Sequence, residues 1–271
     1  MTRRWWLPAI AIALGVAVVG TVAHNWDPPL PPAAADSLAP AVPAEVLQRA
    51  GERRVFFGHM SVGWNLLSGV AAIYSADSIR QPAEVQIKVG ESFLGFPAGQ
   101  GGIVHAEIGV NGDPLGKLVN FDAMVRSGIA AQVDVAVLKF CYTEFGADTD
   151  VEAVFAKYAA TMQELRRDFP RVHFLYATVP LEVPPSGVKG LLKSWLGRDA
   201  NVQRERFNAL VRQHFGGPAL FDVAAVEATA PDGSASAGLY PPYSSDGSHL
   251  NGAGAKVLAA HFLQLVASVG S

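Results

Sequence analysis

Short apolar runs alternate along the chain with segments in which apolar residues recur every three or four positions. The runs predict buried strands, and the recurrences predict helices with one apolar face. Such alternation is typical of a parallel sheet with helices on both faces. The runs predict five strands, at residues 54–57, 85–89, 133–142, 172–179 and 219–223.

Four segments carry the helical spacing. We expect helices from about Val62, over residues 151–165, over residues 199–214, and over a last segment that contains Val257 and Val266 on one face. In an open parallel sheet, ligands bind beyond the carboxyl ends of the strands. The residues that directly follow each strand are therefore the first candidates for a functional site.

The first 43 residues have a different composition. Arg3 and Arg4 precede an apolar run over residues 5–23, which predicts an export signal. Because ~20 apolar residues can span a bilayer, we favour an uncleaved membrane anchor over a signal cleaved after Ala23. Residues 27–43 are rich in Pro and Ala and predict a semi-stiff spacer. We therefore expect an anchor or signal over residues 1–26, a linker over 27–43 and one domain over 44–271, exported and held at the cell envelope or in the periplasm.

Charge and cysteine content exclude several classes of function. The chain has 21 Lys and Arg against 24 Asp and Glu, a net charge of −3, which argues against nucleic-acid binding. Cys141 is the only cysteine, so neither an intramolecular disulfide nor a cysteine zinc cluster is possible. His59, His105 and His249 lack the spacing of metal ligands on one element, and we expect no metal or other cofactor.

Ser61 follows the first predicted strand, in a turn flanked by Gly58 and Gly63. A serine there has two interpretations. It can cap the following helix, or it can act as a nucleophile beside backbone N–H groups that stabilise negative charge.

The stretch YSSDGSHLN, residues 243–251, precedes the last helix. Its small polar residues suit a turn and a helix cap. Asp246, three positions before His249, can also bind the Nδ1–H of His249 and leave Nε2 free to take a proton from serine. Ser61 and this pair are expected on the same edge of the sheet.

A serine turn after an early strand, with Asp-x-x-His before the last helix, resembles the SGNH (GDSL-like) hydrolase superfamily over about residues 55–266. The resemblance implies a flavodoxin-like three-layer α/β/α sandwich with a mainly parallel five-stranded sheet. It also implies Ser61 as nucleophile and His249 and Asp246 as the other members of a triad. Members of the family are mainly esterases, lipases and carbohydrate deacetylases.

The chain departs from the family pattern at two places. It has Gly58-His59-Met60-Ser61 where the family carries Gly-Asp-Ser, and residues 141–144, CYTE, stand where it carries Gly-x-Asn-Asp. Since the oxyanion-binding Asn is absent, Asn111 or Thr143 is expected to donate instead, and Gly102 is favoured as the glycine donor over Gly99 and Gly101. His59 is a candidate for lining the pocket or for a structural role.

We therefore expect an exported serine hydrolase of the esterase or deacetylase type, acting on a small-molecule, glycan or lipid ester. A polysaccharide O-acetyltransferase with the same triad and a non-catalytic carbohydrate-binding module are the alternatives. Residues 181–198 carry Leu192, Trp195 and Leu196 between basic residues. This segment predicts either a lid or membrane-facing flap, or an ordinary surface helix. Glu144 and Glu182 are expected to be solvated loop charges.

Overall fold

The structure is a computed structural model that describes residues 28–35, 39–196 and 199–270. The predicted export signal or anchor, residues 1–26, lies outside the described residues. Among the described residues, no helix combines the length and the apolar character needed to cross a membrane.

Six parallel strands form the sheet, in the order β2-β3-β1-β4-β5-β6. Their bounds are β1 Arg54–His59, β2 Ala83–Gln86, β3 Gly102–Glu107, β4 Val135–Leu138, β5 His173–Ala177 and β6 Leu220–Phe221. The sequence predicted five of these strands and missed β3. Its apolar run is interrupted by His105, and its glycine-rich start suggests a loop.

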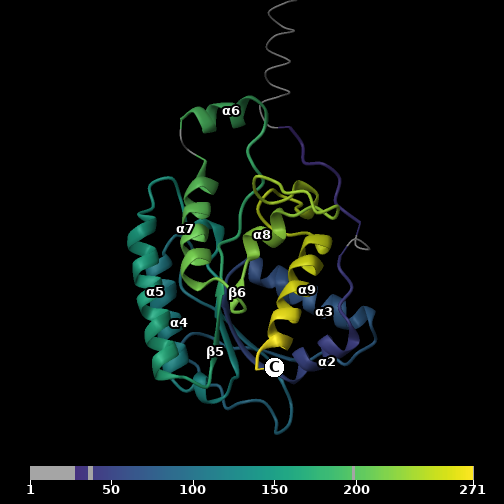
Figure 1. Cartoon of the computed structure of the whole chain (residues 1–271), viewed down its shortest axis with the longest axis vertical. Helices are drawn as coiled ribbons and strands as arrows, with labels where there is room; N and C mark the ends of the chain where they lie inside the picture. Colours follow the sequence, from purple (N-terminus) through teal and green to yellow (C-terminus); the bar gives the residue numbers. More distant parts are fainter. Residues whose placement is uncertain (1–27, 36–38, 197–198, 271) are drawn as a thin grey trace, which may run out of the picture.

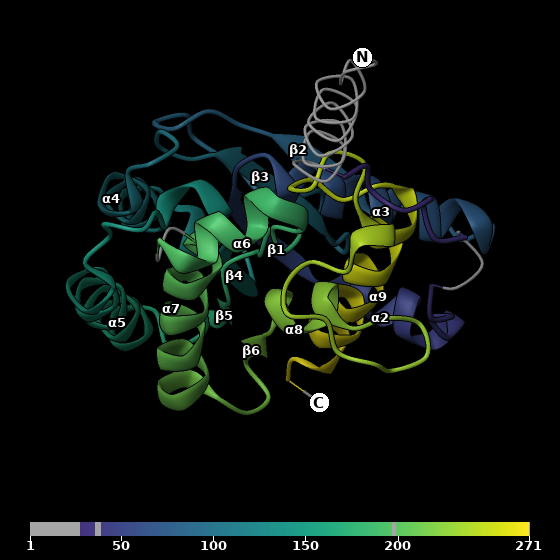
Figure 2. The same cartoon turned by 90° about the horizontal axis from the view of Figure 1, so that it is seen from above.

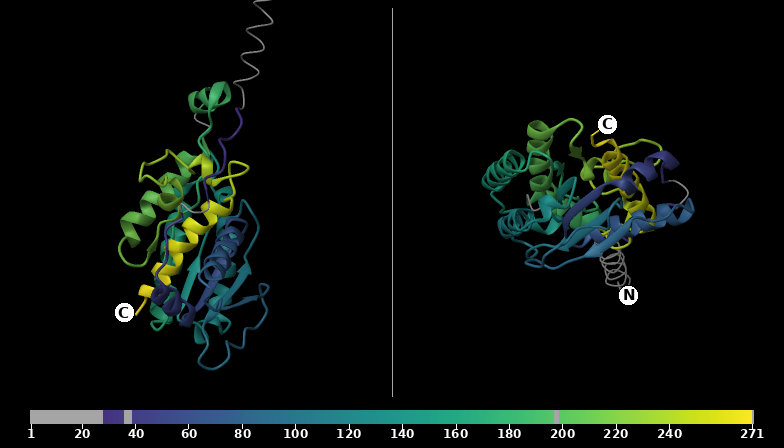
Figure 3. Two further views of the ribbon diagram at one scale, coloured as in Figure 1. Left: turned by 90° about the vertical axis from the view of Figure 1, so that its right-hand side faces the viewer. Right: turned by 90° about the horizontal axis from the view of Figure 1, so that it is seen from below.

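Helices cover both faces of the sheet, which confirms the predicted α/β sandwich (Figure 1, Figure 2). One core cluster joins α2, α3, α8 and α9 to the sheet, and a second joins α4, α5 and α7 to the other face. The helices are α2 Ala44–Glu52, α3 Val62–Ala76, α4 Pro114–Arg126, α5 Val151–Asp168, α6 Gly187–Trp195, α7 Ala200–Phe215, α8 Val223–Ala228 and α9 Gly252–Ser268. The side view shows the sheet between the two helical layers (Figure 3).

The strand order reverses at β1. From β1 the chain passes to β2 and β3 on one side of the sheet, and β4 then pairs with β1 on the other side. A crevice opens at the carboxyl ends of the strands where such a reversal occurs. The segments that follow β1 and β4 are therefore placed side by side at this crevice.

Helices α3 and α9 pack closely at Gly69. A Cβ atom at this position would lie 2.2 Å from the carbonyl oxygen of Ala255 on α9 and 2.9 Å from the Cβ of Ala259. The missing side chain lets the two helices approach, and this contact holds α9 beside the helix that follows Ser61.

We expect Gly69→Ala to lower the free energy of unfolding by about 1–3 kcal/mol, because the added methyl group must push α9 away. Chemical denaturation measures the change. Ser68→Ala is the control, since Ser68 is the exposed neighbour on the same helix. Equal stability of both variants would contradict the close packing.

Candidate active site

Ser61 stands between β1 and α3 with an unusual backbone conformation. Its φ is 29° and its ψ is −87°, a region that non-glycine residues rarely adopt and that concentrates at functional sites. The side chain makes no capping hydrogen bond to α3. Its Oγ instead lies 3.1 Å from the Sγ of Cys141, which follows β4 across the crevice. The capping interpretation of Ser61 is therefore wrong, although the residue occupies the cap position.

Asp246 and His249 form the pair that their spacing predicts. Asp246 Oδ2 lies 2.7 Å from His249 Nδ1, while Oδ1 accepts the backbone N–H groups of Ser248 at 2.8 Å and His249 at 2.7 Å. Desolvation opposes ionisation, but these hydrogen bonds outweigh it and lower the pKa of Asp246 to about 2. The carboxylate therefore stays ionised near neutral pH and keeps the Nδ1 proton of His249 in place.

Residues 243–251 also contain a helix cap, Asn251, as the turn-and-cap interpretation predicts. Asn251 Oδ1 accepts the N–H groups of Ala253 and Gly254, each at 3.1 Å, at the start of α9. Ser244 Oγ donates to the His249 carbonyl at 2.6 Å and accepts the Gly247 N–H at 2.9 Å. The turn that carries the pair is thus fixed at both ends.

The residues after β4 connect the two halves of the site. Tyr142, next to Cys141, places its hydroxyl 3.4 Å from His249 Nε2. The Leu250 N–H donates to Asn65 Oδ1 of α3 at 3.3 Å, one turn along from Ser61. Within the described residues, the Ser61 hydroxyl contacts Cys141 and makes no hydrogen bond to His249. A side-chain rotation of Ser61 is needed before the imidazole could take its proton.

Lys139 lies buried beneath the Ser61 turn. Its Nζ donates to the Met60 carbonyl at 3.0 Å, an oxygen that also accepts the Gly63 N–H at 2.8 Å. Burial lowers the pKa of Lys139. Burial alone raises the pKa of the Cys141 thiol, but the Lys139 charge and the Ser61 hydroxyl outweigh this effect, and the pKa lies below its usual value. A buried amine and a thiol of lowered pKa therefore lie next to each other at the base of the site.

Glu144 is buried and stabilises the turn that follows β4. It forms a fully buried ion pair with Lys117 at 2.6 Å, and its other oxygen accepts the Cys141 N–H. The expectation that Glu144 is a solvated loop charge is therefore wrong. Its ion-pair partner Lys117 lies 27 positions away in the sequence, so local polarity gave no sign of its burial.

The two proposed side-chain oxyanion donors are engaged with this ion pair. Thr143 Oγ1 donates to Glu144 Oε1 at 3.0 Å, so its only proton is already used. Asn111 Oδ1 accepts from Lys117 Nζ at 3.0 Å, which ties this residue to Lys117 instead of to Ser61. The Thr143 hydroxyl is thus not free to donate to an oxyanion, while a role for the Asn111 amide stays a prediction.

Gly102 is wrong as an oxyanion donor. It begins β3 and pairs with Arg54 at the start of β1, whereas Ser61 follows the end of β1. Its N–H donates to the Arg53 carbonyl at 2.9 Å. A strand rises ~3.3 Å per residue, so the length of β1 separates Gly102 from Ser61.

His59 belongs to the core and does not line a pocket. Its side chain has no exposed surface, and its Nε2 lies 3.0 Å from His105 Nδ1. Burial lowers the pKa of His59 to about 2, so the ring is neutral. A Cβ atom on Gly63 would come within 2.3 Å of this ring, which explains why a glycine follows in the first turn of α3. The structural alternative for His59 is the right one.

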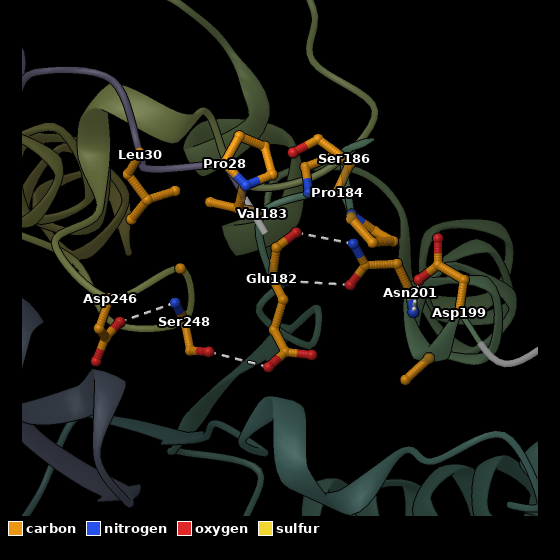
Figure 4. A pocket seen from close by; sticks show the side chains of 13 residues that line it. Pro28, Leu30, Glu182, Val183, Pro184, Ser186, Asp199, Asn201, Asp246 and Ser248 are labelled. Carbon is orange, nitrogen blue, oxygen red and sulfur yellow. Dashed lines mark hydrogen bonds between the residues drawn. The ribbon is translucent and has the colours of Figure 1, made fainter. Parts of the chain in front are cut away.

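A cavity of about 480 Å³ adjoins the turn that carries Asp246 (Figure 4). Asp246 and Ser248 line one side, and Glu182, Asn201 and Ser186 line another. Glu182 Oε1 accepts the Ser248 hydroxyl at 2.9 Å, and Oε2 pairs with Arg204 at 2.7 Å. Glu182 therefore supports the turn that carries Asp246 and is not the solvated loop charge that we expected.

In the part of the chain that the structure describes, no group of three or more His, Cys, Asp or Glu side chains is arranged to hold a metal ion. His59 and His105 lie together in the core, while His249 lies in the turn before α9. The three histidines considered from the sequence are thus not one cluster.

No family model and no curated protein matches the chain. Solved structures do match it. One is a Streptococcus pneumoniae protein provisionally described as a platelet activating factor, with 15% identity, a TM-score of 0.47, and coverage of 93% of this chain and 97% of that one. Another is a Desulfitobacterium hafniense protein provisionally described as a lipolytic protein of the G-D-S-L family, with 14% identity, a TM-score of 0.44, and coverage of 79% and 99%.

A third is an acetyl xylan esterase, with 15% identity, a TM-score of 0.43, and coverage of 77% and 97%. The second carries the name of the family that the sequence motifs resemble. At these identities and TM-scores the likenesses decide nothing about activity. The functional argument therefore rests on the side chains of this chain.

Glu227 of α8 is a further buried acid near Lys139 that the sequence did not single out. Its carboxyl accepts the Leu181 N–H, and only 2% of the residue is exposed. Burial raises its pKa to about 8, against an opposing effect of Lys139. The folded protein therefore keeps a proton here that the unfolded chain releases above pH ~4.5.

The contribution of Glu227 to the unfolding free energy should fall between pH 5 and pH 8, because the unfolded chain then binds fewer protons at Glu227 than the folded protein. The buried His59 and His105, whose pKa values are lowered, contribute with the opposite sign in the acidic part of this range. Glu227→Gln removes only the Glu227 titration, so the difference in unfolding free energy between the native chain and this variant should shift against the native chain from pH 5 to pH 8. Urea denaturation at several pH values measures both proteins. Parallel pH profiles would show that Glu227 is ionised in the fold.

Proposed function

We propose that the protein is an exported serine hydrolase that cleaves an acyl ester through Ser61, His249 and Asp246. The observation that carries the proposal is the Asp246–His249 pair, 2.7 Å apart at Oδ2 and Nδ1. With Nδ1 bound to Asp246, the imidazole Nε2 faces Tyr142, one of the residues that follow β4. The strained backbone of Ser61 at the same edge supports the role of nucleophile.

In the proposed reaction, His249 Nε2 takes the hydroxyl proton of Ser61 as its Oγ attacks the ester carbonyl. Asp246 stabilises the imidazolium that forms. The proton then passes from His249 to the leaving alkoxide, an acyl–Ser61 ester remains, and water activated by His249 hydrolyses it. Because its pKa is about 2, Asp246 stays negatively charged near neutral pH and can stabilise the imidazolium.

Backbone N–H groups at the start of α3 are the proposed oxyanion donors. Gly63 and Trp64 donate to the carbonyls of Met60 and Ser61, at 2.8 Å each. The N–H groups of Ser61 and Val62 come before these first hydrogen bonds of the helix. At the N-terminus of a helix, free N–H donors and the helix dipole favour negative charge. The buried Lys139 amine adds to the positive potential there.

A fluorophosphonate probe tests the nucleophile. We expect the full chain to be labelled and Ser61→Ala to remain unlabelled, because the probe reacts only with an activated serine. Ser68→Ala, at an exposed position of α3, is the matched control and should be labelled like the native chain. Mass spectrometry of the labelled peptide identifies the site. Labelling of Ser61→Ala at the native level would refute the mechanism.

Hydrolysis of p-nitrophenyl acetate gives the companion measurement. His249→Ala should lower kcat by ~10³-fold or more, whereas His214→Ala, at an exposed position of α7, should not.

A non-catalytic binding module has one observation in its favour, the contact of Ser61 with Cys141 in place of His249. A module of this kind would bind an acetylated glycan and resist the probe entirely. Lack of labelling in the native chain, together with glycan binding, would therefore decide for this alternative.

The buried Lys139 side chain gives a further prediction. Lys139→Met keeps the length of the side chain but removes the donor to the Met60 carbonyl and the nearby charge. We expect kcat to fall by ~10-fold, less than the ~10² for loss of a direct oxyanion donor, with KM little changed. Because the Met side chain fills nearly the same volume in the core, the variant should fold, and its circular dichroism spectrum checks this. An unchanged kcat would exclude a role for Lys139 in positioning Ser61.

A further inference from the structure

Helix α6 presents an apolar row to solvent. Leu192 is 42% exposed, Trp195 82% and Leu196 46%. Residues three and four positions apart lie on the same side of a helix, so the three side chains form one continuous surface. Single exposed apolar residues are ordinary, but a contiguous patch marks a contact site.

The sequence of α6 fits one kind of contact. In the sequence, Lys189 and Lys193 stand within α6, and Arg198 follows it. Helices with an apolar face, large side chains such as Trp and Leu, and basic residues at the border lie in the interface of a bilayer. Basic residues there attract anionic lipid headgroups.

The path of the chain points to the same partner. Pro28 and Leu30 of the linker line one cavity together with Pro184, Pro185 and Ser186, which lead into α6 (Figure 4). The described chain thus begins beside this helix. Before Pro28 the sequence carries Arg3, Arg4 and the apolar run of residues 5–23, which predicts a bilayer anchor. By sequence, the predicted anchor therefore joins the described chain at the end that lies beside the segment leading into α6.

We propose that the Leu192, Trp195 and Leu196 face of α6 rests in the surface of an anionic lipid bilayer. Asp246 and Ser248 line the same cavity as the residues that lead into α6, so the candidate site opens beside that surface. It follows, resting on the proposed function, that the substrate is an ester presented at the membrane surface by an amphiphilic molecule.

Spin labels test the position of α6 directly. Trp195→Cys in the full chain is labelled with a nitroxide and reconstituted into vesicles of phosphatidylcholine and phosphatidylglycerol. We expect the label to become accessible to oxygen and protected from a water-soluble nickel complex, because it lies among acyl chains. The native chain is the control for labelling, since its buried Cys141 should take no label.

Val119→Cys is the matched control in the same vesicles. Val119 of α4 is 60% exposed and lies on a different helix, so its label should stay accessible to nickel. Equal nickel accessibility at positions 195 and 119 would overturn the proposal. Protection at position 195 with dipolar broadening would also overturn it, because a second copy of the chain would then cover α6.

Enzyme assays separate this proposal from the proposed function. Trp195→Ser should lower hydrolysis of a vesicle-borne ester by ~10-fold, equivalent to ~1.4 kcal/mol of lost apolar contact, and leave hydrolysis of p-nitrophenyl acetate unchanged. Loss of activity on both substrates would overturn a role limited to the membrane. A native chain that hydrolyses neither ester refutes the proposed function, while the spin labels still decide the placement of α6.

Discussion

The parallel pairing of β1 with β4 is the constraint on which the rest of the candidate site depends. Val55 to Gly58 pair with Val135 to Leu138 in one register, so both strands end at the same height. Ser61 and Cys141 follow these ends and come into contact across the point where the strand order reverses. Any shift of this register would separate the serine from the turn that reaches His249. The closely packed α3 and α9 then bring the Asp246 turn to the same edge.

Buried charge is the second general feature of this region. Lys117 and Glu144 lie together with no exposed side-chain surface, and Lys139 and Glu227 are buried nearby. Breaking a buried pair costs about 3–5 kcal/mol, although the intact pair itself adds little stability. These buried groups position the backbone of the two turns. Glu144 accepts the Cys141 N–H, and Lys139 donates to the Met60 carbonyl. The turns on both sides of the crevice are thus fixed by groups that solvent cannot reach.

The sequence pattern predicted those helices and side-chain pairs that depend on residues close together in the chain. The apolar spacing gave α5, α7 and α9, and the three-residue spacing in a glycine turn gave Asp246 and His249. The strand β3 was missed because His105 looks polar in sequence, yet it is buried through its bond to His59, 46 positions away. The assignment of Gly102 failed with it. Lys139 and Glu144 were not recognised for the same reason, because only the tertiary fold supplies their partners.

The linker has a consequence for the boundary of the functional unit. By composition the folded part starts at Ala44, where α2 begins, but Pro28 and Leu30 form part of the wall of the cavity next to Asp246. The Ala34 N–H also donates to the Pro242 carbonyl at 2.8 Å, just before the turn that carries Asp246. A chain shortened to Ala44 would keep the whole sheet, yet one core cluster would lose Val42 and the cavity would lose one side. The segment that looks like a spacer is therefore a structural part of the site.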